Sequence, residues 1–451
     1  MKQNYKNYLK LKIQSAKRLI IFIALFGFSQ SAYSQNVLTA QDAVKIALEN
    51  NYSIKIAENQ KNISDNNTTI GNAGFLPNLD ASASYNRSSN DTKQNYSNGT
   101  VVDRTGAISK NYAAGVNLNW TIFDGLKMFA SLDQLKELKK TGETNYKIAI
   151  EQNISDVLSS FYDIVRQELL LEVIKKNISI SEERLKIVNN EKEVGAASKF
   201  DLLKAQVDLN TDKSSLLNQQ EQLAEARVKL NRVLGRDINT EFEVDKEIEI
   251  NQDLSYTDLK PVAVENNSEL LLAMQNKNIS ELQLRLERSE LFPKISLNLG
   301  YNYSKSESDA GFFISSNTTA LSYGATVSFN LFNGLNTRRK IENAQVAIEN
   351  SEFQYQQTYD QFNAALLNAY QKYENSLELV KLEAENYKAA EENSNLALER
   401  LRVGSITPID FRESQKDMLN AKSRLVSAQY NAKNSETELL KISGQLVKSA
   451  K

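Results

Sequence analysis

The chain has 451 residues and a net charge of −2, and it contains neither cysteine nor histidine. Thiol, disulfide and imidazole chemistry are therefore excluded, together with the commonest zinc and haem ligands, and the balanced charge gives no reason to expect a nucleic-acid partner. Only 4 proline and 16 glycine residues occur, which favours long uninterrupted helices over a loop-rich fold. We expect no cofactor and no metal.

The N-terminal segment has the composition of a secretory signal peptide. Basic residues up to Arg18 precede an apolar run from Leu19 to Phe28, and small residues follow at Ala32 and Ser34. We expect residues 1–34 to be removed, because the apolar run is too short to remain as a membrane-spanning helix. No later stretch approaches the roughly 18 apolar residues of such a helix, so an exported chain that enters a membrane must use strands.

Two halves of the chain carry similar motifs in the same order. Ala47–Asn51 is matched by Ala263–Asn267 at an offset of 216, and Phe123–Leu126 is matched by Phe332–Leu335 at an offset of 209. A length change confined to one exposed connection is typical of duplicated structural units. We therefore predict a first repeat over 35–235, a linker over 236–255, a second repeat over 256–444 and a tail over 445–451.

Each repeat contains a pair of strands in which apolar and polar side chains alternate, predicted as hairpins over 78–123 and 294–332. Such alternation over about ten residues, with a small polar face, is the pattern of a strand between lipid and a water-filled lumen. A soluble sheet with one wet face is the alternative, but aromatic side chains on the apolar face favour the membrane. The apolar sets are Leu79, Ala81, Ala83 and Tyr85; Ala114, Val116, Leu118, Trp120 and Ile122; Ile295, Leu297, Leu299, Tyr301 and Tyr303; and Leu321, Tyr323, Ala325, Val327, Phe329 and Leu331.

Four strands are too few to close a barrel around a lumen. Bacterial barrels need about eight or more, so other copies of the chain must complete the sheet, and three chains would supply twelve strands. The polar segments Arg87–Asn111 and Lys305–Thr319 are expected to be exposed outer loops. These patterns therefore predict an α+β membrane protein with an internal two-fold repeat, in which a transmembrane β-barrel is completed by other copies of the chain.

A proline-free run follows each hairpin, from Leu126 to about Val194 and from Leu335 to about Val403. At 1.5 Å per residue, each run would form a helix roughly 100 Å long. Each returning helix then carries an apolar stripe with a seven-residue period, which indicates a coiled-coil core rather than a cofactor site. The stripes are Leu202, Leu209, Leu216, Leu223 and Leu230 in the first repeat, and Phe411, Met418, Leu425, Ala432 and Leu439 in the second.

The two long helices turn back at matched tips, where a glycine ends one helix and a hydroxyl residue begins the next. Ser198 with Asp201, and Thr407 with Asp410, have the spacing of capping boxes. Pro408 stands at the first helical position, where its missing N–H costs nothing. A structural role as helix caps is therefore the simpler interpretation of these residues.

The duplicated hairpins, the Phe-Asp/Asn-Gly-Leu motifs after them and the paired Val-Gly tips resemble the outer membrane efflux protein family. The resemblance covers almost all of the predicted mature chain. It implies a fold class in which a trimeric, twelve-stranded transmembrane β-barrel in the outer membrane joins an all-α, coiled-coil helical barrel in the periplasm, with the chain as a homotrimer. It also implies an exit duct for drugs, small toxic molecules or secreted proteins, supplied by a periplasmic adaptor protein and an inner-membrane pump of the RND or ABC type.

The resemblance also assigns roles to the tips. It implies that six tip residues meet the adaptor, namely Val194, Gly195, Ala196, Val403, Gly404 and Ser405. Asp410 and Glu413 match an acidic pair that rings the closed periplasmic aperture, whereas the first repeat has Asp201 and Lys204 there. A gate-locking arginine of the family's best-known member is replaced by Ile406, so a lock built on that position is not expected here. Arg400 and Arg402, one turn earlier, are the alternative candidates for it.

A scaffold and an enzyme are the two alternative functions, and each agrees less well with the sequence. A periplasmic coiled-coil scaffold would explain the helices but not two amphipathic hairpins placed symmetrically. An enzyme could use only carboxylate, Ser, Lys or Tyr groups, and no second constellation orients any of them. The sequence therefore favours a passive duct without catalytic residues, in which selection is electrostatic.

Overall fold

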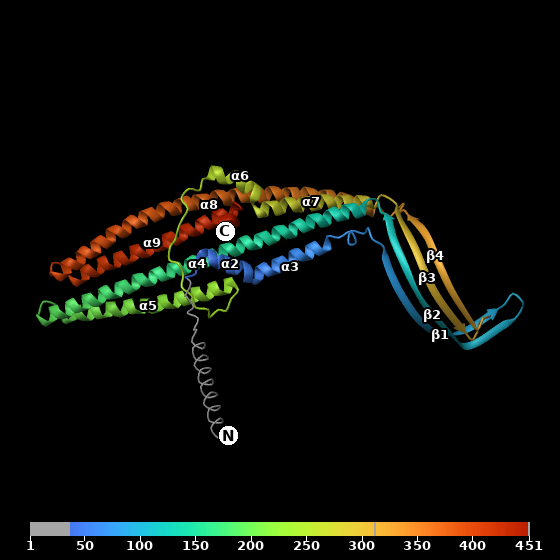
Figure 1. Cartoon of the computed structure of the whole chain (residues 1–451), viewed down its shortest axis with the longest axis horizontal. Coiled ribbons are helices and arrows are strands. Elements are labelled where there is room, and N and C mark those ends of the chain that lie inside the picture. Colours follow the sequence, from blue (N-terminus) through green and yellow to red (C-terminus); the bar gives the residue numbers. More distant parts are fainter. Residues whose placement is uncertain (1–36, 311–312, 450–451) are drawn as a thin grey trace, which may run out of the picture.

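The computed structural model describes residues 37–310 and 313–449. It is elongated, with a four-stranded sheet at one end and two helical hairpin tips at the other (Figure 1). The predicted signal peptide, residues 1–34, lies outside the described residues, as do the last two residues of the predicted tail. Within the described ranges, no helix combines the length and apolar character needed to cross a membrane.

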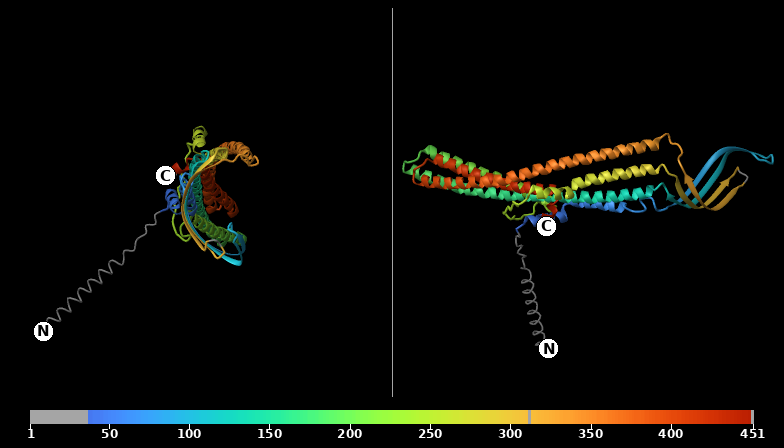
Figure 2. Two further views of the ribbon diagram at one scale, coloured as in Figure 1. Left: turned by 90° about the vertical axis from the view of Figure 1, so that its right-hand side faces the viewer. Right: turned by 90° about the horizontal axis from the view of Figure 1, so that it is seen from above.

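The sheet is antiparallel, and its strands follow one another in chain order. They are β1 (Asn78–Asn95), β2 (Val101–Phe123), β3 (Lys294–Ser308) and β4 (Ser315–Ser328). The two hairpins thus form one sheet through the β2–β3 pairing, although about 170 residues of helix and linker separate them in the chain. The sheet is strongly curved and bends away from the helices (Figure 2).

The register aligns the alternation that the sequence predicts. One row across the sheet contains Leu79, Leu118, Leu299 and Tyr323, and the neighbouring row contains Asp80, Asn117, Gly300 and Ser322. Because successive side chains point to opposite faces, one face is apolar and the other is small and polar. The polar face is tightly arranged, since a Cβ added at Gly115 would lie 1.9 Å from the side-chain oxygen of Asn302.

The prediction of two long outer loops is wrong in extent. The pairing continues through most of Arg87–Asn111, with a register shift after Asn90 and a turn between Asn95 and Val101, and β3 and β4 likewise extend into Lys305–Thr319. Backbone hydrogen bonds hold a ladder together whatever the side chains, and these exposed segments need no buried face. The predicted strand end at Leu331 is also wrong, because β4 ends at Ser328.

Four helices form the long body and the tips. α4 (Lys127–Glu193) and α8 (Asn336–Arg402) have 67 residues each, and α5 (Lys199–Leu234) and α9 (Pro408–Ile442) return from the tips. Each long helix would therefore extend roughly 100 Å. The remaining helices are α2 (Ala40–Asn50), α3 (Tyr52–Asn67), α6 (Tyr256–Asn266), α7 (Ser268–Ser289) and the short α10 (Leu446–Ser449).

The helices form two sets of four side-by-side helices, one after the other along the long axis of the molecule, which we call layers. Toward the sheet the order of contacts is α3, α4, α7, α8, and toward the tips it is α5, α4, α9, α8. Figure 1 shows α4 and α8 running through both layers, whereas α3 and α7 occupy one and α5 and α9 the other. The predicted linker runs without helix between α5 and α6 and makes one isolated bridge, from Val244 to Leu38.

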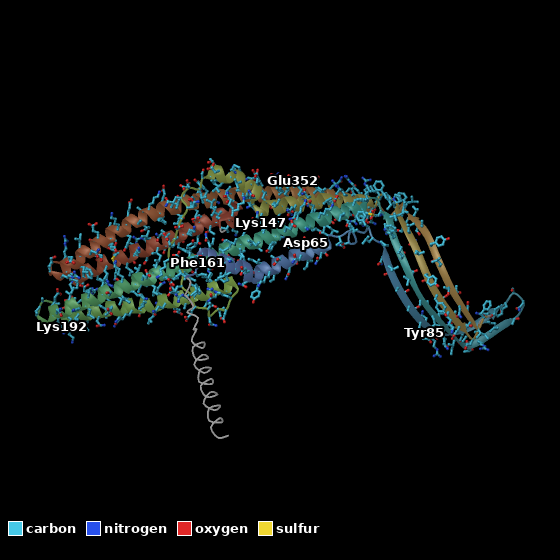
Figure 3. All side chains as sticks on the ribbon, in the orientation of Figure 1. Asp65, Tyr85, Lys147, Phe161, Lys192 and Glu352 are labelled. Atoms are coloured by element: carbon cyan, nitrogen blue, oxygen red, sulfur yellow. The ribbon has the colours of Figure 1, made fainter. Side chains whose placement is uncertain are left out.

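The apolar stripes form the helical core. On α4, Ile154, Val157, Phe161 and Ile164 are buried, and they pack with α5 and α2 in one cluster around the middle of the molecule. All five stripe residues of α9 are buried, whereas on α5 Leu202 and Leu216 are only partly so. Figure 3 labels Phe161 near the middle of the helical body.

A recurring joint links each short helix pair to the end of a returning helix. Asn51 is the N-cap of α3, and its side-chain amide donates to the Val233 carbonyl over 2.7 Å. Next to it, the Gly235 backbone lies against Asn50. In the second half, Asn267 donates to the Ile442 carbonyl over 2.9 Å, and Gly444 lies against Asn266 in the same way. The Asn-Asn and Gly motifs that recur in the sequence are thus the two sides of one contact. We call these contacts the Asn–Gly joints.

The motifs Phe123–Leu126 and Phe332–Leu335 make the passage from strand to long helix. In each, a glycine and the leucine after it adopt positive φ, with Leu126 at 69° and Leu335 at 63°. A non-glycine residue in this region costs about 1–2 kcal/mol, so the surrounding structure holds both leucines there. The helix therefore begins directly after each motif, with three residues between it and the end of β2 in the first half and seven between it and the end of β4 in the second.

Candidate functional site

The tips are built by backbone geometry that only glycine adopts easily. Gly195 and Gly404 have φ of 79° and 70°, and a Cβ added at either would meet nothing within 4 Å. Glycine is therefore placed there by its φ rather than by lack of space. The N–H of Ala196 donates to the Glu191 carbonyl, and that of Ser405 donates to Arg400, which closes each helix end in a Schellman arrangement.

Both returning helices begin with reciprocal capping boxes. The hydroxyls of Ser198 and Thr407 each donate to the carboxylate three residues later over 2.6 Å, and each accepts that residue's backbone N–H. Pro408 stands at the start of α9. The hydrogen bonds from Thr407 hold the pKa of Asp410 below its usual 3.8, and those from Ser198 lower the pKa of Asp201. Within one chain, hydrogen bonding therefore favours the charged form of Asp410.

This geometry makes a prediction for the cap. Thr407→Ala should speed amide hydrogen exchange in the first turn of α9 by roughly fivefold, because the backbone N–H of Asp410 loses its acceptor. Thr407→Ser keeps the oxygen and should leave exchange unchanged. Because the folded-state pKa of Asp410 is lowered, its stabilising effect is present above the unfolded value and is lost as the pH falls through the folded one. Equal exchange in the alanine and serine variants would contradict the role of the cap.

The tips expose the residues that the sequence singles out for contact with another protein. Val194 and Val403 are 80% and 78% exposed, and Gly195, Ala196, Gly404 and Ser405 are also exposed. Figure 3 labels Lys192 close to the first of these turns, at the end of the molecule opposite the sheet. The two tips therefore present similar projecting apolar ends.

Asp410 and Glu413 both lie exposed in the first turns of α9, one helical turn apart. Ile406, between Gly404 and the cap, packs instead against a small apolar cluster at the tip containing Leu401 and Phe411. That position therefore contributes apolar packing and no charge to the tip.

A surface ion pair near the tips joins the two coils, by which we mean α4 with α5 and α8 with α9. Arg402 of α8 lies 2.5 Å from the carboxylate of Glu183 on α4 and 2.6 Å from that of Glu399. Both members of the α8–α4 pair are about two-fifths exposed. Such exposed pairs contribute little to stability, because water screens them.

A buried charged cluster, which was not predicted from the sequence, lies behind this surface. Arg412 of α9 makes two parallel hydrogen bonds to Asp212 of α5, over 2.9 and 2.8 Å, and Ser181 of α4 donates to the same carboxylate over 2.6 Å. The side chains of Arg412 and Asp212 are only 9% and 7% exposed. The whole set, which we call the tip cluster, is Asn177, Ser181, Arg184, Asp208, Asp212, Arg412 and Gln415.

The tip cluster connects three helices from both halves of the chain. Gln415 is fully buried and donates to the Ser181 hydroxyl and the Asn177 carbonyl of α4, while Arg184 donates to Asp208 of α5 over 2.7 Å. A signal for it exists in the heptads, because Asp212 follows Leu209 by three residues and so occupies the second core column of α5. A charged residue in a core column needs a buried partner.

Among residues 37–310 and 313–449, no group of three or more acidic side chains could hold a metal ion. The features that stand out are instead a two-faced sheet, two capped tips and a charged cluster between coils.

The chain matches the model of a family described as "Outer membrane efflux protein" over residues 43–236 and 260–445. It is 19% identical over 419 residues to the outer membrane efflux protein BepC of Brucella suis, covering 92% of this chain and 87% of that protein. It is 20% identical to the outer membrane protein TolC of Vibrio cholerae, covering 92% and 91% of the two chains.

Solved structures agree with these matches. The outer membrane channel CmeC of Campylobacter jejuni superposes with a TM-score of 0.75, covering 90% of this chain and 86% of that one at 17% identity. The predicted combination of long helices with four antiparallel strands is thereby confirmed. The chain belongs to the outer membrane efflux protein family, whose members are channels rather than enzymes and form the outer membrane exit of efflux systems.

Proposed function

We propose that three copies of this chain form a closed, passive export duct, with the sheet in the outer membrane and the helices in the periplasm. The observation that carries this proposal is the register of the sheet, which gathers the apolar side chains of all four strands on one face. Strands β1 and β4 are left with open edges. Pairing β1 of one copy with β4 of the next would remove every edge and leave the polar face around a lumen.

The apolar face has the dimensions of a membrane band. On β2 it runs from Tyr112 to Ile122, eleven residues that span about 34 Å along the strand. At the usual strand tilt this corresponds to a height of roughly 26 Å, close to the apolar band of outer membrane barrels. Trp120 lies near one end, and the rings of Tyr85 and Tyr112 lie 4.8 Å apart at the other. Aromatic side chains at both limits match the two interfaces of a bilayer.

The outer helices also carry apolar side chains that no helix of the same chain covers. On α5, Phe200, Leu203 and Val207 are 68%, 55% and 63% exposed, and on α8 Leu382 and Leu396 are more than half exposed. These two helices form the edges of the layer near the tips. Packing α5 of one copy against α8 of the next would bury both stripes and close the helical tube.

In this trimer, Asp410 and Glu413 would meet their copies near the narrow end. Six carboxylates at one constriction would attract cations and repel anions. Ile406 packs with the apolar residues Leu401 and Phe411 and carries no charge. We therefore assign the connection between the two coils to Arg412 with Asp212, assisted by Arg402 with Glu183. Opening the aperture would require these contacts between coils to break or rearrange.

The exposed tips would meet a periplasmic adaptor, which connects the duct to an inner-membrane pump of the RND or ABC type. The surface offered to it comprises Val194, Gly195 and Ala196 on the first tip and Val403, Gly404 and Ser405 on the second. The relatives include a solvent efflux pump protein and a toluene efflux pump protein of Pseudomonas putida, each 23% identical. Export of small toxic molecules is therefore the form of transport that we favour over export of proteins.

Single-channel recording tests the proposal. The purified protein in a planar bilayer should give small, cation-selective openings that a trivalent cation blocks from the helical side. Asp410→Asn with Glu413→Gln should weaken this block by roughly tenfold or more and lower the cation preference, because the constriction loses its charge. Asp201→Asn is the matched control at the first tip and should behave as wild type. Unchanged block in the double variant would show that the two acids only cap and solvate the helix.

A further inference from the structure

Beyond the outer aromatic limit of the apolar face, the same face of the sheet becomes positively charged. The register places Arg87 opposite Lys110 and Lys110 opposite Glu307, two rows beyond Tyr85 and Tyr112 and so on the same face. Lys305 pairs with Tyr112 in the aromatic row, with its ammonium 5.8 Å from the ring centre. Three cations and one acid thus lie where the apolar band ends. Figure 3 labels Tyr85 in the part of the sheet remote from the helices.

In the rows next to this group, the charges are confined to one face. Every residue on the opposite face of these rows of β1, β2 and β3 is uncharged, and these residues are Ser84, Asn86, Ser88, Ser109, Asn111, Ala113, Ser304, Ser306 and Ser308. Further charges, on Asp91, Lys93, Asp103 and Arg104, follow only beyond the register shift after Asn90. If the cations served only to keep the outer end of the sheet soluble, they would be equally useful on either face. Their segregation to the apolar face indicates a role toward whatever surrounds the sheet.

The single acid does not neutralise the group. Glu307 lies 2.6 Å from Lys305 and 3.8 Å from Lys110, so one carboxylate is shared between two ammonium groups. Among the residues that the structure describes, Arg87 makes no ion pair, and its side chain is exposed. Arg87, Lys110, Lys305 and Glu307 together therefore keep a net positive charge in each copy, and three copies would repeat this group around the barrel.

We propose that Arg87, Lys110 and Lys305 form a docking surface for the phosphate groups of anionic lipids in the outer leaflet. This inference rests on the proposed membrane position of the sheet and adds the class of lipid that surrounds it. The argument is charge complementarity together with continuity, because the cations directly extend the apolar face at headgroup depth. Guanidinium and ammonium groups both bind phosphate well, and cations next to a membrane-embedded surface attract anionic headgroups.

The test compares lipids retained by the full-length mature protein. The protein is inserted into bilayers of phosphatidylcholine alone or mixed with phosphatidylglycerol, and the lipids that remain bound after extraction are counted by native mass spectrometry. Wild type should retain phosphatidylglycerol well above its share of the bilayer. The triple variant Arg87→Gln, Lys110→Gln, Lys305→Gln should lose this enrichment by roughly tenfold or more, since each cation near the surface contributes several-fold. Lys372→Gln, Lys381→Gln, Lys388→Gln on α8 removes equal charge far from the sheet and should retain it.

Several results would overturn the inference. Equal enrichment in the triple variant and wild type would show that these cations do not select lipids. Loss of enrichment on adding millimolar inorganic phosphate would indicate a site for free anions rather than a lipid surface. Failure of the wild type to insert into either bilayer would overturn the proposed function and the docking surface together, whereas normal insertion without lipid preference would overturn the docking surface alone.

Discussion

Replacing Asp212 with alanine should destabilise the tip half of the protein by about 3–5 kcal/mol, because it leaves the Arg412 guanidinium buried without its main partner. Arg412 keeps Asp208 at 3.9 Å and Gln415 at 3.1 Å, but neither gives it a second pair of parallel hydrogen bonds. Urea unfolding of the detergent-solubilised protein measures the change, and hydrogen exchange along α5 and α9 locates it.

Two further variants separate a buried ion pair from a surface one. Asp212→Leu with Arg412→Met replaces both charges by apolar groups of similar size and should recover most of the stability lost by Asp212→Ala. Arg402→Ala breaks the exposed pair with Glu183 and should change stability little. A double variant no more stable than Asp212→Ala would contradict this explanation, since the loss would then come from packing rather than from an unpaired charge.

Gly444→Ala should destabilise the second Asn–Gly joint by about 2–5 kcal/mol. The new Cβ would lie 2.5 Å from the backbone oxygen of Asn266, which cannot move without shifting the start of α7. The residue also has φ of 67°, which costs any L side chain about 1–2 kcal/mol. Thermal unfolding followed by circular dichroism measures the effect.

Gly404→Ala is the matched control for this prediction. Its φ of 70° is nearly the same, but nothing lies within 4 Å of the added Cβ. Only the backbone strain applies there, so the cost should be about 1–2 kcal/mol. Equal losses in the two variants would mean that the close approach at Asn266 relaxes freely and that the joint does not depend on it.

Periodicity explains why much of this fold could be predicted from sequence. The alternation at Leu79–Tyr85 and the heptads beginning at Leu202 and Phe411 are local patterns, and each determines which face of its element is buried. The tips were predictable for a similar reason, because glycine and a capping box lie within a few residues of each other. The break between α2 and α3 at Asn51 was not predicted. Asn51 caps α3 locally, but its side chain also bonds to a residue 182 positions away, a contact that no local pattern indicates.

The candidate site was only partly predictable. Asp212 and Arg412 are 200 residues apart, and no local pattern connects them. Their importance depends on burial, which appears only when α4, α5 and α9 come together. The extent of β1 and β2 was underestimated because Ser and Asn side chains give no alternation signal, although their backbones pair as well as any others.

Asp410 illustrates a different limit. Its spacing from Thr407 predicts a helix cap and its resemblance to a family residue predicts a place at the gate, and one carboxylate can serve both. The hydrogen bonds that form the cap also favour the charged state, so the cap would help to keep the aperture acidic. The sequence cannot rank these roles, because each requires the same residue at the same place.

The Asn–Gly joints have a mechanical consequence for the tips. Each joint clamps the end of a returning helix at mid-length, and the 36 residues of α5 beyond it would form a lever of roughly 54 Å. A tilt of one degree at the clamped end would then move the free end by about 0.9 Å. In the proposed trimer, a tilt of a few degrees around Gly235 and Gly444, which lie against Asn50 and Asn266, would therefore move the tips by the width of a small molecule.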